Sequence, residues 1–380
     1  MNDRNRKTDT NEIDSRKQPL WYSGRYFDYP LFGIVLGLVL FGLVMVYSTS
    51  SYRADELYGD STYFAKRQLV FELVALVGMF LVSKIDYRRY ARYSKYFLYV
   101  AIALLVLVYI IGSASHGSTR WIYIGAFGFQ PSEFAKLALI VYTADICTRK
   151  PRSLNTIKGL AKMLLLPLIT IVLIAIENLS TAIICFGIVM IIVFVASPKN
   201  WHFILMGVLG ILMCVVFIAT AGYRADRIRI WLAPEKYDDG YQTMQSLYAI
   251  GSGGFFGRGL GNSIQKMGFI PESHNDMIFS VICEELGLFG AVLTIIMFIL
   301  LIYRCTVLAI NSGDRFGGLI AVGVMAHIAV QVLINISVVT NTIPPTGVPL
   351  PFISYGLSSL VSMSAGIGLV LNINLQKKKY

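Results

Sequence analysis

The sequence predicts an all-α polytopic membrane protein with ten transmembrane helices. Of the 380 residues, 56% are hydrophobic and only 14% are charged, and the mean hydropathy is +0.63. A soluble protein of this size has about 25% charged residues. These values therefore exclude an ordinary soluble enzyme, a disordered chain and a disulfide-framed secreted domain.

Ten apolar segments have the length that a helix needs to cross a bilayer, about 20 residues. They are 30–50, 68–83, 96–112, 131–147, 162–177, 179–197, 202–222, 276–303, 315–340 and 354–374. The fifth and sixth are nearly continuous, and we divide them at Glu177-Asn178 because one undivided helix would be too long for the membrane. The first follows a polar tail, so we interpret it as a membrane helix rather than a cleaved signal.

The distribution of Lys and Arg predicts the orientation. If the N-terminus is cytoplasmic, the cytoplasmic segments contain about twice as many Lys and Arg as the outer segments, as the positive-inside rule requires. We therefore expect a cytoplasmic polar tail at 1–29, a membrane domain at 30–375 and a basic cytoplasmic tail at 376–380. The net charge of +11 then reflects topology and attraction to anionic lipid, and we expect no nucleic-acid partner.

The outer face carries the longest connections, and we expect the function to lie there. Residues 223–275 form a large extracytoplasmic loop between helices 7 and 8, and residues 113–130 and 341–353 are further outer segments. Six glycines within 251–261 (GSGGFFGRGLG) indicate a backbone bent for close approach, as in re-entrant structure.

Ionisable residues inside apolar segments are costly and are therefore functional candidates. Glu133 and Lys136 are three residues apart and can pair directly on a helix, either to stabilise packing or to line a polar cavity. Glu177 lies at the tight turn between spans five and six, where it is either hydrated or functional. Glu284 and Glu285 lie deeper in span eight, and we expect buried polar contacts between helices for them.

Asp276 opens the eighth predicted span, where the helix dipole favours a carboxylate. Asp276 is either a helix cap or a catalytic group. The catalytic role is supported by Gln265, Lys266 and His274, which precede it within a dozen residues. Guanidinium groups of Arg224 and Arg227, just after span seven, suit phosphate.

Arg224 and Arg227 are also explained by interfacial snorkelling.

The five cysteines are dispersed, and the sequence contains no CxxC pair, Walker loop, GxSxG elbow or HExxH motif. We therefore expect neither a zinc site nor ATP-driven transport by this chain alone.

Several separated motifs occur in a fixed order along the chain. They are RWI at 120–122, QPSEFAK at 130–136, GYQ at 240–242 leading to AIGSGG at 249–254, SIQK at 263–266, PESHNDMIF at 271–279, EELG at 284–287, PTG at 345–347 and LPFISYG at 350–356. Over about 28–375 the sequence resembles the SEDS family, the RodA, FtsW and SpoVE membrane proteins of bacterial cell-wall growth. SIQK resembles FtsW and SpoVE more than RodA. The chain departs from the family at Glu177-Asn178, where Pro-Asp is usual, and at Leu357, where a glycine is usual.

The resemblance implies a peptidoglycan glycosyltransferase that polymerises lipid II, an undecaprenyl-diphosphate disaccharide-peptide, on the outer face of the bacterial cytoplasmic membrane. In this family the residue that matches Asp276 is regarded as the essential catalytic aspartate, and it would act here as the general base. Charge stabilisation of the diphosphate would come from Arg224, Arg227, Lys266 or a divalent cation, Mg²⁺ or Mn²⁺; we assign no metal ligands. The remaining candidate substrate-binding residues are Gln265, His274, Glu133, Lys136, Glu177, Ser354, Tyr355 and Ser358.

The resemblance also implies partners: the nascent glycan strand, a class B penicillin-binding protein with a single membrane span, and other divisome or elongasome membrane proteins. Two alternatives stay open at this point. The chain could be a lipid II flippase, or a scaffold that recruits the penicillin-binding protein. Against a flippase, the sequence shows no pair of corresponding broken helices.

Overall fold

The computed structural model describes residues 27–115, 118–124, 127–199, 201–219 and 222–376. Within these ranges the chain is mainly helical, and a helix lies at each of the ten predicted segments. They are α1 (Tyr29–Tyr58), α2 (Tyr63–Lys84), α3 (Tyr87–Ile111), α4 (Pro131–Arg149), α5 (Ile157–Glu177), α6 (Leu179–Ala196), α7 (Trp201–Ala219), α10 (Ile278–Ile310), α11 (Arg315–Val339) and α12 (Leu357–Leu375). Seven helices of the described part are long and apolar enough to cross a membrane: α1, α3, α5, α6, α10, α11 and α12.

The outer segments contain regular structure that the sequence analysis did not predict, so the all-α expectation was incomplete. Strands β1 (Ser113–Ser115), β2 (Ser118–Ile124) and β3 (Phe127–Phe129) form an antiparallel sheet in the order β1-β2-β3, with Ile122 opposite Phe129. The aromatic and β-branched residues of this stretch favour strands. The large loop contains helices α8 (Gly222–Leu232) and α9 (Tyr241–Ser252), and the short 3₁₀ turns η2 (Pro234–Lys236) and η3 (Asp238–Gly240). A third 3₁₀ turn, η1 (Pro151–Asn155), joins α4 to α5.

The predicted division between spans five and six is confirmed. Helix α5 ends at Glu177, and Asn178 leaves the helical conformation. The Asn178 side chain then accepts a hydrogen bond of 3.1 Å from the Thr181 backbone N–H, which caps the start of α6. A polar capping residue therefore separates two apolar helices that composition alone would merge.

Helix α10 differs from the predicted span at both ends and in the middle. It begins at Ile278 rather than at Asp276, and it extends to Ile310. Gly287 interrupts it with φ +67° and ψ −163°, a conformation that suits glycine. Span ten is also shorter at its start, because α12 begins at Leu357 and leaves Ser354 and Tyr355 in the preceding loop.

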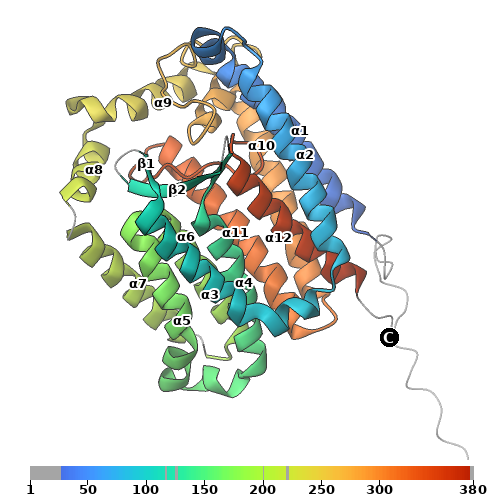
Figure 1. Cartoon of the computed structure of the whole chain (residues 1–380). Coiled ribbons are helices and arrows are strands. Elements are labelled where there is room, and N and C mark those ends of the chain that lie inside the picture. The colour runs from blue at the N-terminus through green and yellow to red at the C-terminus, as the bar shows by residue number, and fades with distance from the viewer. Residues whose placement is uncertain (1–26, 116–117, 125–126, 200, 220–221, 377–380) are drawn as a thin grey trace, which may run out of the picture.

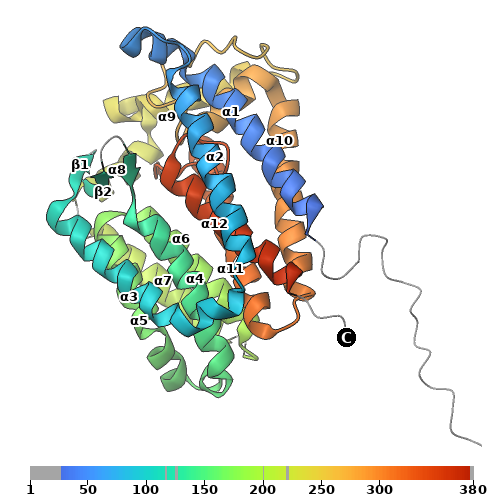
Figure 2. The same cartoon turned by 45° about the vertical axis from the view of Figure 1, so that its right-hand side comes forward.

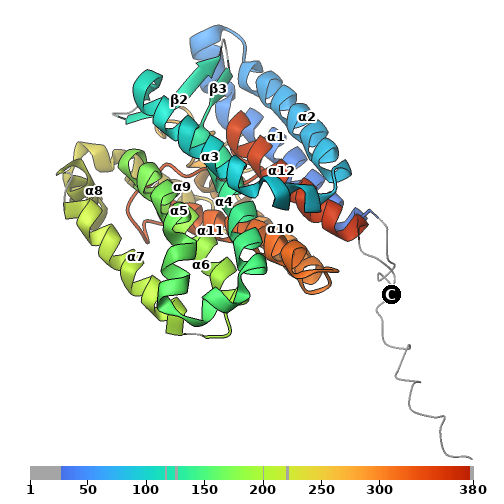
Figure 3. The same ribbon diagram turned by 60° about the horizontal axis from the view of Figure 1, so that its bottom comes forward.

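Helix α11 lies in the middle of the bundle and contacts α4, α6, α10 and α12. Helices α1, α2, α10 and α12 lie on one side of the molecule, and α3 to α7 lie on the other (Figures 1 and 3). Helices α8 and α9 and the small sheet gather at one end (Figures 1 and 2). The η1 connection, the start of α1 and the end of α12 lie at the opposite end. The sheet and the two helices of the large loop, which the sequence analysis assigned to the outer face, therefore lie at one end of the bundle.

Candidate active site

Asp276 lies in the irregular segment that precedes α10, and it is not the first residue of the helix. The residue is half-buried, and its backbone carbonyl accepts a hydrogen bond of 2.7 Å from Asn335 Nδ2 of α11. Its carboxylate lies beside Gly347, since a Cβ at that glycine would be 3.7 Å from Asp276 Oδ2. The PTG motif at 345–347 and the motif containing Asp276 are thus brought together by the fold.

Ser354 and Tyr355 hold the segment that contains Asp276 by its backbone. Ser354 Oγ donates to the Asn275 carbonyl at 2.6 Å, and the Tyr355 N–H donates to the His274 carbonyl at 3.0 Å. Each of these bonds joins two segments that are distant in the sequence. These two residues of LPFISYG therefore position the backbone just before the aspartate.

His274 is buried among aromatic side chains. Its ring lies 4.7 Å from the ring of Phe64 and 5.4 Å from that of Tyr355. Burial lowers the pKa of His274 from 6.5 to about 4, so the imidazole is neutral at pH 7. Its contacts are those of a packing residue that anchors the segment.

Arg227 approaches the same site from α8. Its Nη1 donates to the Pro345 carbonyl at 3.3 Å, two residues before Gly347. Trp231 Nε1, one turn further along α8, donates to the Asn341 carbonyl at 2.9 Å. Two side chains of α8 thus bind the 341–347 segment and place a guanidinium group at the loop that faces Asp276. The side chain of Arg224 lies outside the described part of the structure.

Glu133 and Lys136 form the predicted pair, at 2.7 Å between Oε1 and Nζ, and both are buried. Lys136 Nζ also donates to Gln331 Oε1 at 3.1 Å. Gln331 Nε2 in turn donates to the Pro349 carbonyl at 3.0 Å. The ion pair is therefore connected through α11 to the loop that contains Gly347.

Sequence reasoning missed Gln331 and Asn335, both of which are buried polar residues of α11. Together with His327 they are spaced four residues apart, which places all three on one face of the helix. That spacing within an apolar segment was the available signal.

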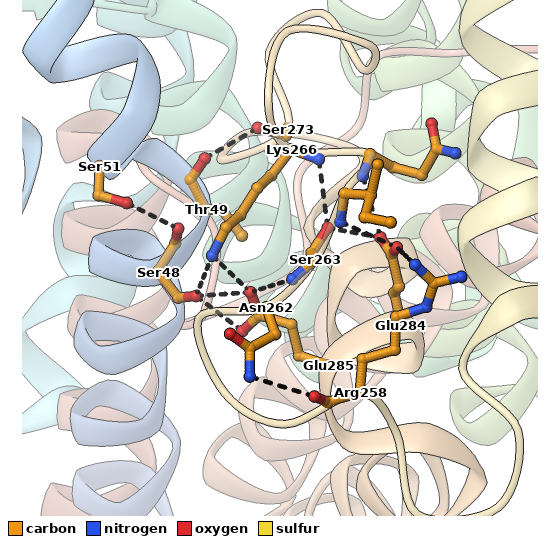
Figure 4. A network of polar contacts seen from close by, with 12 residues as sticks. Ser48, Thr49, Ser51, Arg258, Asn262, Ser263, Lys266, Ser273, Glu284 and Glu285 are labelled. Atoms are coloured by element: carbon orange, nitrogen blue, oxygen red, sulfur yellow. Dashed lines mark hydrogen bonds and ion pairs between the residues drawn. The ribbon is translucent and has the colours of Figure 1, made fainter.

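Lys266 and Glu285 form a second buried ion pair, at 2.8 Å (Figure 4). Ser48 of α1 completes it: its Oγ lies 3.1 Å from Lys266 Nζ and 2.7 Å from Glu285 Oε1. The side chain of Lys266 is only 4% exposed and that of Glu285 is not exposed at all. The ammonium group of Lys266, which we predicted to bind a diphosphate, is therefore neutralised by Glu285 inside the protein.

The carboxylate of Glu284, the neighbour of Glu285, binds backbone N–H groups of the same loop (Figure 4). It accepts hydrogen bonds from the N–H groups of Ile264 at 3.0 Å and Gln265 at 3.3 Å, and it lies 3.6 Å from Arg258 Nη1. The expected buried contacts of the two glutamates are therefore present, although most of them are with the large loop rather than with another helix. Together the two carboxylates anchor residues 258–266 to α10.

The glycine-rich segment docks into the break in α10. The N–H groups of Arg258 and Gly259 bond to the carbonyls of Glu284 and Glu285 at 3.0 and 2.9 Å. In return the N–H of Leu288 bonds to the Gly254 carbonyl at 2.9 Å. The loop thus satisfies backbone groups that the break leaves without a helical partner. This is the close backbone approach that the six glycines predicted.

Glu177 and Ser358 belong to the surroundings of the sheet. The Glu177 carbonyl accepts a bond of 3.2 Å from Arg120 Nε of β2. Ser358 Oγ of α12 donates to the Gly128 carbonyl at 3.0 Å and accepts from the Gln130 N–H at 3.2 Å. These contacts hold the sheet against α5 and α12, and they do not involve Asp276.

No group of three His, Cys, Asp or Glu side chains in the described ranges is arranged to hold a metal ion. Asp276 is the carboxylate that the fold brings to the PTG loop. The donor set of the described residues therefore does not indicate a resident divalent cation. The involvement of Mg²⁺ or Mn²⁺ stays a prediction.

Comparisons with known proteins agree with this arrangement of motifs. The family model described as cell cycle protein, FtsW, RodA and SpoVE, matches residues 29–379. The chain is 40% identical to stage V sporulation protein E of Bacillus subtilis (strain 168) over 90% of this chain and 95% of that protein. It is 38% identical to a probable peptidoglycan glycosyltransferase FtsW of Trichlorobacter lovleyi over 92% and 93% of the two chains.

Among solved structures, the chain is similar to one in a peptidoglycan synthase complex described as coordinating polymerization and crosslinking. The TM-score is 0.78, with 28% sequence identity over 93% of this chain and 99% of that one. The likeness therefore extends over nearly the whole of both chains.

Proposed function

Because the chain belongs to the FtsW, RodA and SpoVE family and is a peptidoglycan glycosyltransferase of the bacterial cytoplasmic membrane, we propose that it polymerises lipid II with Asp276 as the general base. The observation that carries this proposal is the position of Asp276. Its carboxylate lies beside Gly347, in a loop that also binds Arg227. A base and a cation thus meet at one small region where the outer segments converge.

The reaction needs one proton transfer and one departing anion. Asp276 takes the proton of the acceptor hydroxyl as its oxygen bonds to the anomeric carbon of the donor sugar. The bond from that carbon to the diphosphate oxygen breaks, and undecaprenyl diphosphate leaves with the electron pair. A positioned general base contributes about 10² to 10⁴-fold in rate.

Among the candidate cations whose side chains the structure describes, we assign stabilisation of the leaving diphosphate to Arg227. Its guanidinium group is bound at the Pro345 carbonyl, close to the loop that faces Asp276. Lys266 is already paired with Glu285 and buried, so we assign it to the architecture of the loop. A guanidinium group can donate to phosphate in bidentate fashion while keeping one bond to the protein.

We further propose that all ten helices of the predicted segments cross the membrane and that both termini are cytoplasmic. The start of α1 and the end of α12 lie at the same end of the bundle, as ten crossings require (Figure 1). The site then faces the outer side, where the glycan grows. Convergence of the site at one end of the bundle favours glycosyl transfer over a flippase.

We also propose a class B penicillin-binding protein as partner, because the similar solved chain belongs to a complex that couples polymerization with crosslinking. Such a partner would supply the crosslinking step in addition to catalysis by this chain. A role as a scaffold alone is not favoured.

The decisive experiment compares the wild type with Asp276→Asn in a lipid II polymerisation assay with purified protein, with and without divalent cation. We expect Asp276→Asn to fold and to lose polymerisation. Asp239→Asn is the matched control, since it removes an exposed carboxylate from the same outer loop and should polymerise like the wild type. Undiminished polymerisation by Asp276→Asn would exclude Asp276 as the base. Scrambling of labelled lipid II by the wild type, without formation of polymer, would favour a flippase.

A further inference from the structure

Helix α11 carries a buried amide that joins the two halves of the site. Asn335 is 1% exposed, and its Nδ2 donates to the Asp276 carbonyl at 2.7 Å and to the Val348 carbonyl at 2.8 Å. The first acceptor belongs to the segment before α10, and the second follows Gly347 directly. One side chain therefore fixes the distance between the backbone of the base and the loop beside it.

The chemistry of this contact requires an amide. The NH₂ group of Asn has two hydrogens, so one nitrogen can satisfy two carbonyls at once. Within the described residues Asn335 Oδ1 has no hydrogen-bond partner, so the side chain contributes through its donors. Leucine would remove the Asn335 donor from both carbonyls in a buried place, which is costly.

Gln331, one turn earlier on α11, makes the same kind of contact. Its Nε2 donates to the Pro349 carbonyl at 3.0 Å, and its Oε1 accepts from Lys136 at 3.1 Å. Lys136 is in turn paired with Glu133. Successive carbonyls of the loop are therefore bound to one helix, and the hydrogen bond from Lys136 joins that helix to α4.

We propose that Asn335 is a positioning residue for glycosyl transfer: it keeps the carboxylate of Asp276 in register with the 345–349 loop. The inference rests on the proposed function, because it gives Asn335 a role only if Asp276 is the base. A displacement of about 1 Å in a reacting group can cost about 100-fold in rate. The loss of these two bonds would therefore lower kcat more than it changes the binding of lipid II.

Asn372 offers a matched control at the other end of the bundle. It too is 1% exposed and joins two segments, since its Nδ2 donates to the Ser83 carbonyl at 2.6 Å and its Oδ1 accepts from the Tyr87 N–H at 2.8 Å. Substitution by leucine removes two buried hydrogen bonds at either position. The two variants should therefore lose similar thermal stability, and only their effect on catalysis should differ.

The test measures kcat and KM for lipid II with the purified full-length protein, per folded molecule as judged by gel filtration and thermal unfolding. We expect Asn335→Leu to lower kcat by about 10 to 100-fold with KM within about threefold of the wild type. Asn335→Ser keeps one donor and should give an intermediate kcat. If the leucine variant does not fold, the kcat of Asn335→Ser tests the positioning role. Asn372→Leu should keep the wild-type kcat.

Wild-type kcat in the folded Asn335 variants would overturn the proposal, as would an equal fall in Asn372→Leu or a change confined to KM. The two proposals can fail separately. If Asp276→Asn still polymerises lipid II, the proposed function fails whatever Asn335 does. If Asp276→Asn is inactive and Asn335→Leu has the wild-type kcat, only the positioning role fails.

Discussion

The buried charges of Lys266 and Glu285 compensate each other. Lys266 and Glu285 meet at 2.8 Å, and Ser48 of α1 bonds to both of them. Removing one partner of a buried pair leaves the other charge without compensation, which typically costs about 3 to 5 kcal/mol. Replacing both partners by neutral groups costs far less.

We therefore predict that Lys266→Met lowers the melting temperature strongly and that the double variant Lys266→Met/Glu285→Gln regains most of the loss. The measurement is thermal unfolding of the purified protein in detergent. Lys66→Met is the control, since Lys66 pairs with Asp60 at 2.9 Å with a side chain that is 70% exposed, and such surface pairs contribute about 1 kcal/mol or less. A double variant no more stable than Lys266→Met would show that the pair is not what stabilises the loop.

At the scale of elements, the main device is the docking of the glycine-rich loop into the broken helix α10. Gly253 packs so closely that a Cβ would lie 1.9 Å from the Cys283 carbonyl oxygen. Gly287 supplies the break itself, with a positive φ. The loop and the helix therefore form one unit, and this unit leads directly into the segment that contains Asp276.

We predict that Gly253→Ala prevents this docking and lowers both the yield of folded protein and its polymerising activity. Gly251→Ala is the control: Gly251 lies in helix α9, which ends directly before Gly253, and a Cβ there would meet no atom within 4 Å. Alanine in place of glycine in a helix gains up to about 1 kcal/mol, so Gly251→Ala should be neutral or stabilising. Gel filtration of fluorescent fusions and the lipid II assay read out both variants, and wild-type behaviour of Gly253→Ala would refute the tight crossing.

At the scale of the whole molecule, topology decides which solvent the site faces. We predict that a cysteine at Glu235 reacts with a membrane-impermeant maleimide in intact cells, whereas a cysteine at Lys95 reacts only after permeabilisation. Both positions are exposed, in the large loop and in the first turns of α3. Four native cysteines are buried and Cys214 is half-buried, so Cys214→Ser serves as the background. Labelling of Lys95→Cys in intact cells would reverse the proposed orientation.

The sequence by itself determined those features that depend on local pattern. Ten apolar segments predicted where the ten helices lie, and the polar Asn178 marked the start of α6. The three-residue spacing of Glu133 and Lys136 predicted their ion pair. Each of these depends on hydropathy or on contacts within one or two helical turns.

Only the tertiary structure decided which distant segments meet. Nothing local shows that Asn335 binds the Asp276 carbonyl or that Lys266 is paired with Glu285 and bonded to Ser48. These contacts join residues tens to hundreds of positions apart, so they exist only after the helices have packed. Motif spacing could identify Asp276 as a candidate, but its neighbours were determined by the way α8, α10 and α11 converge.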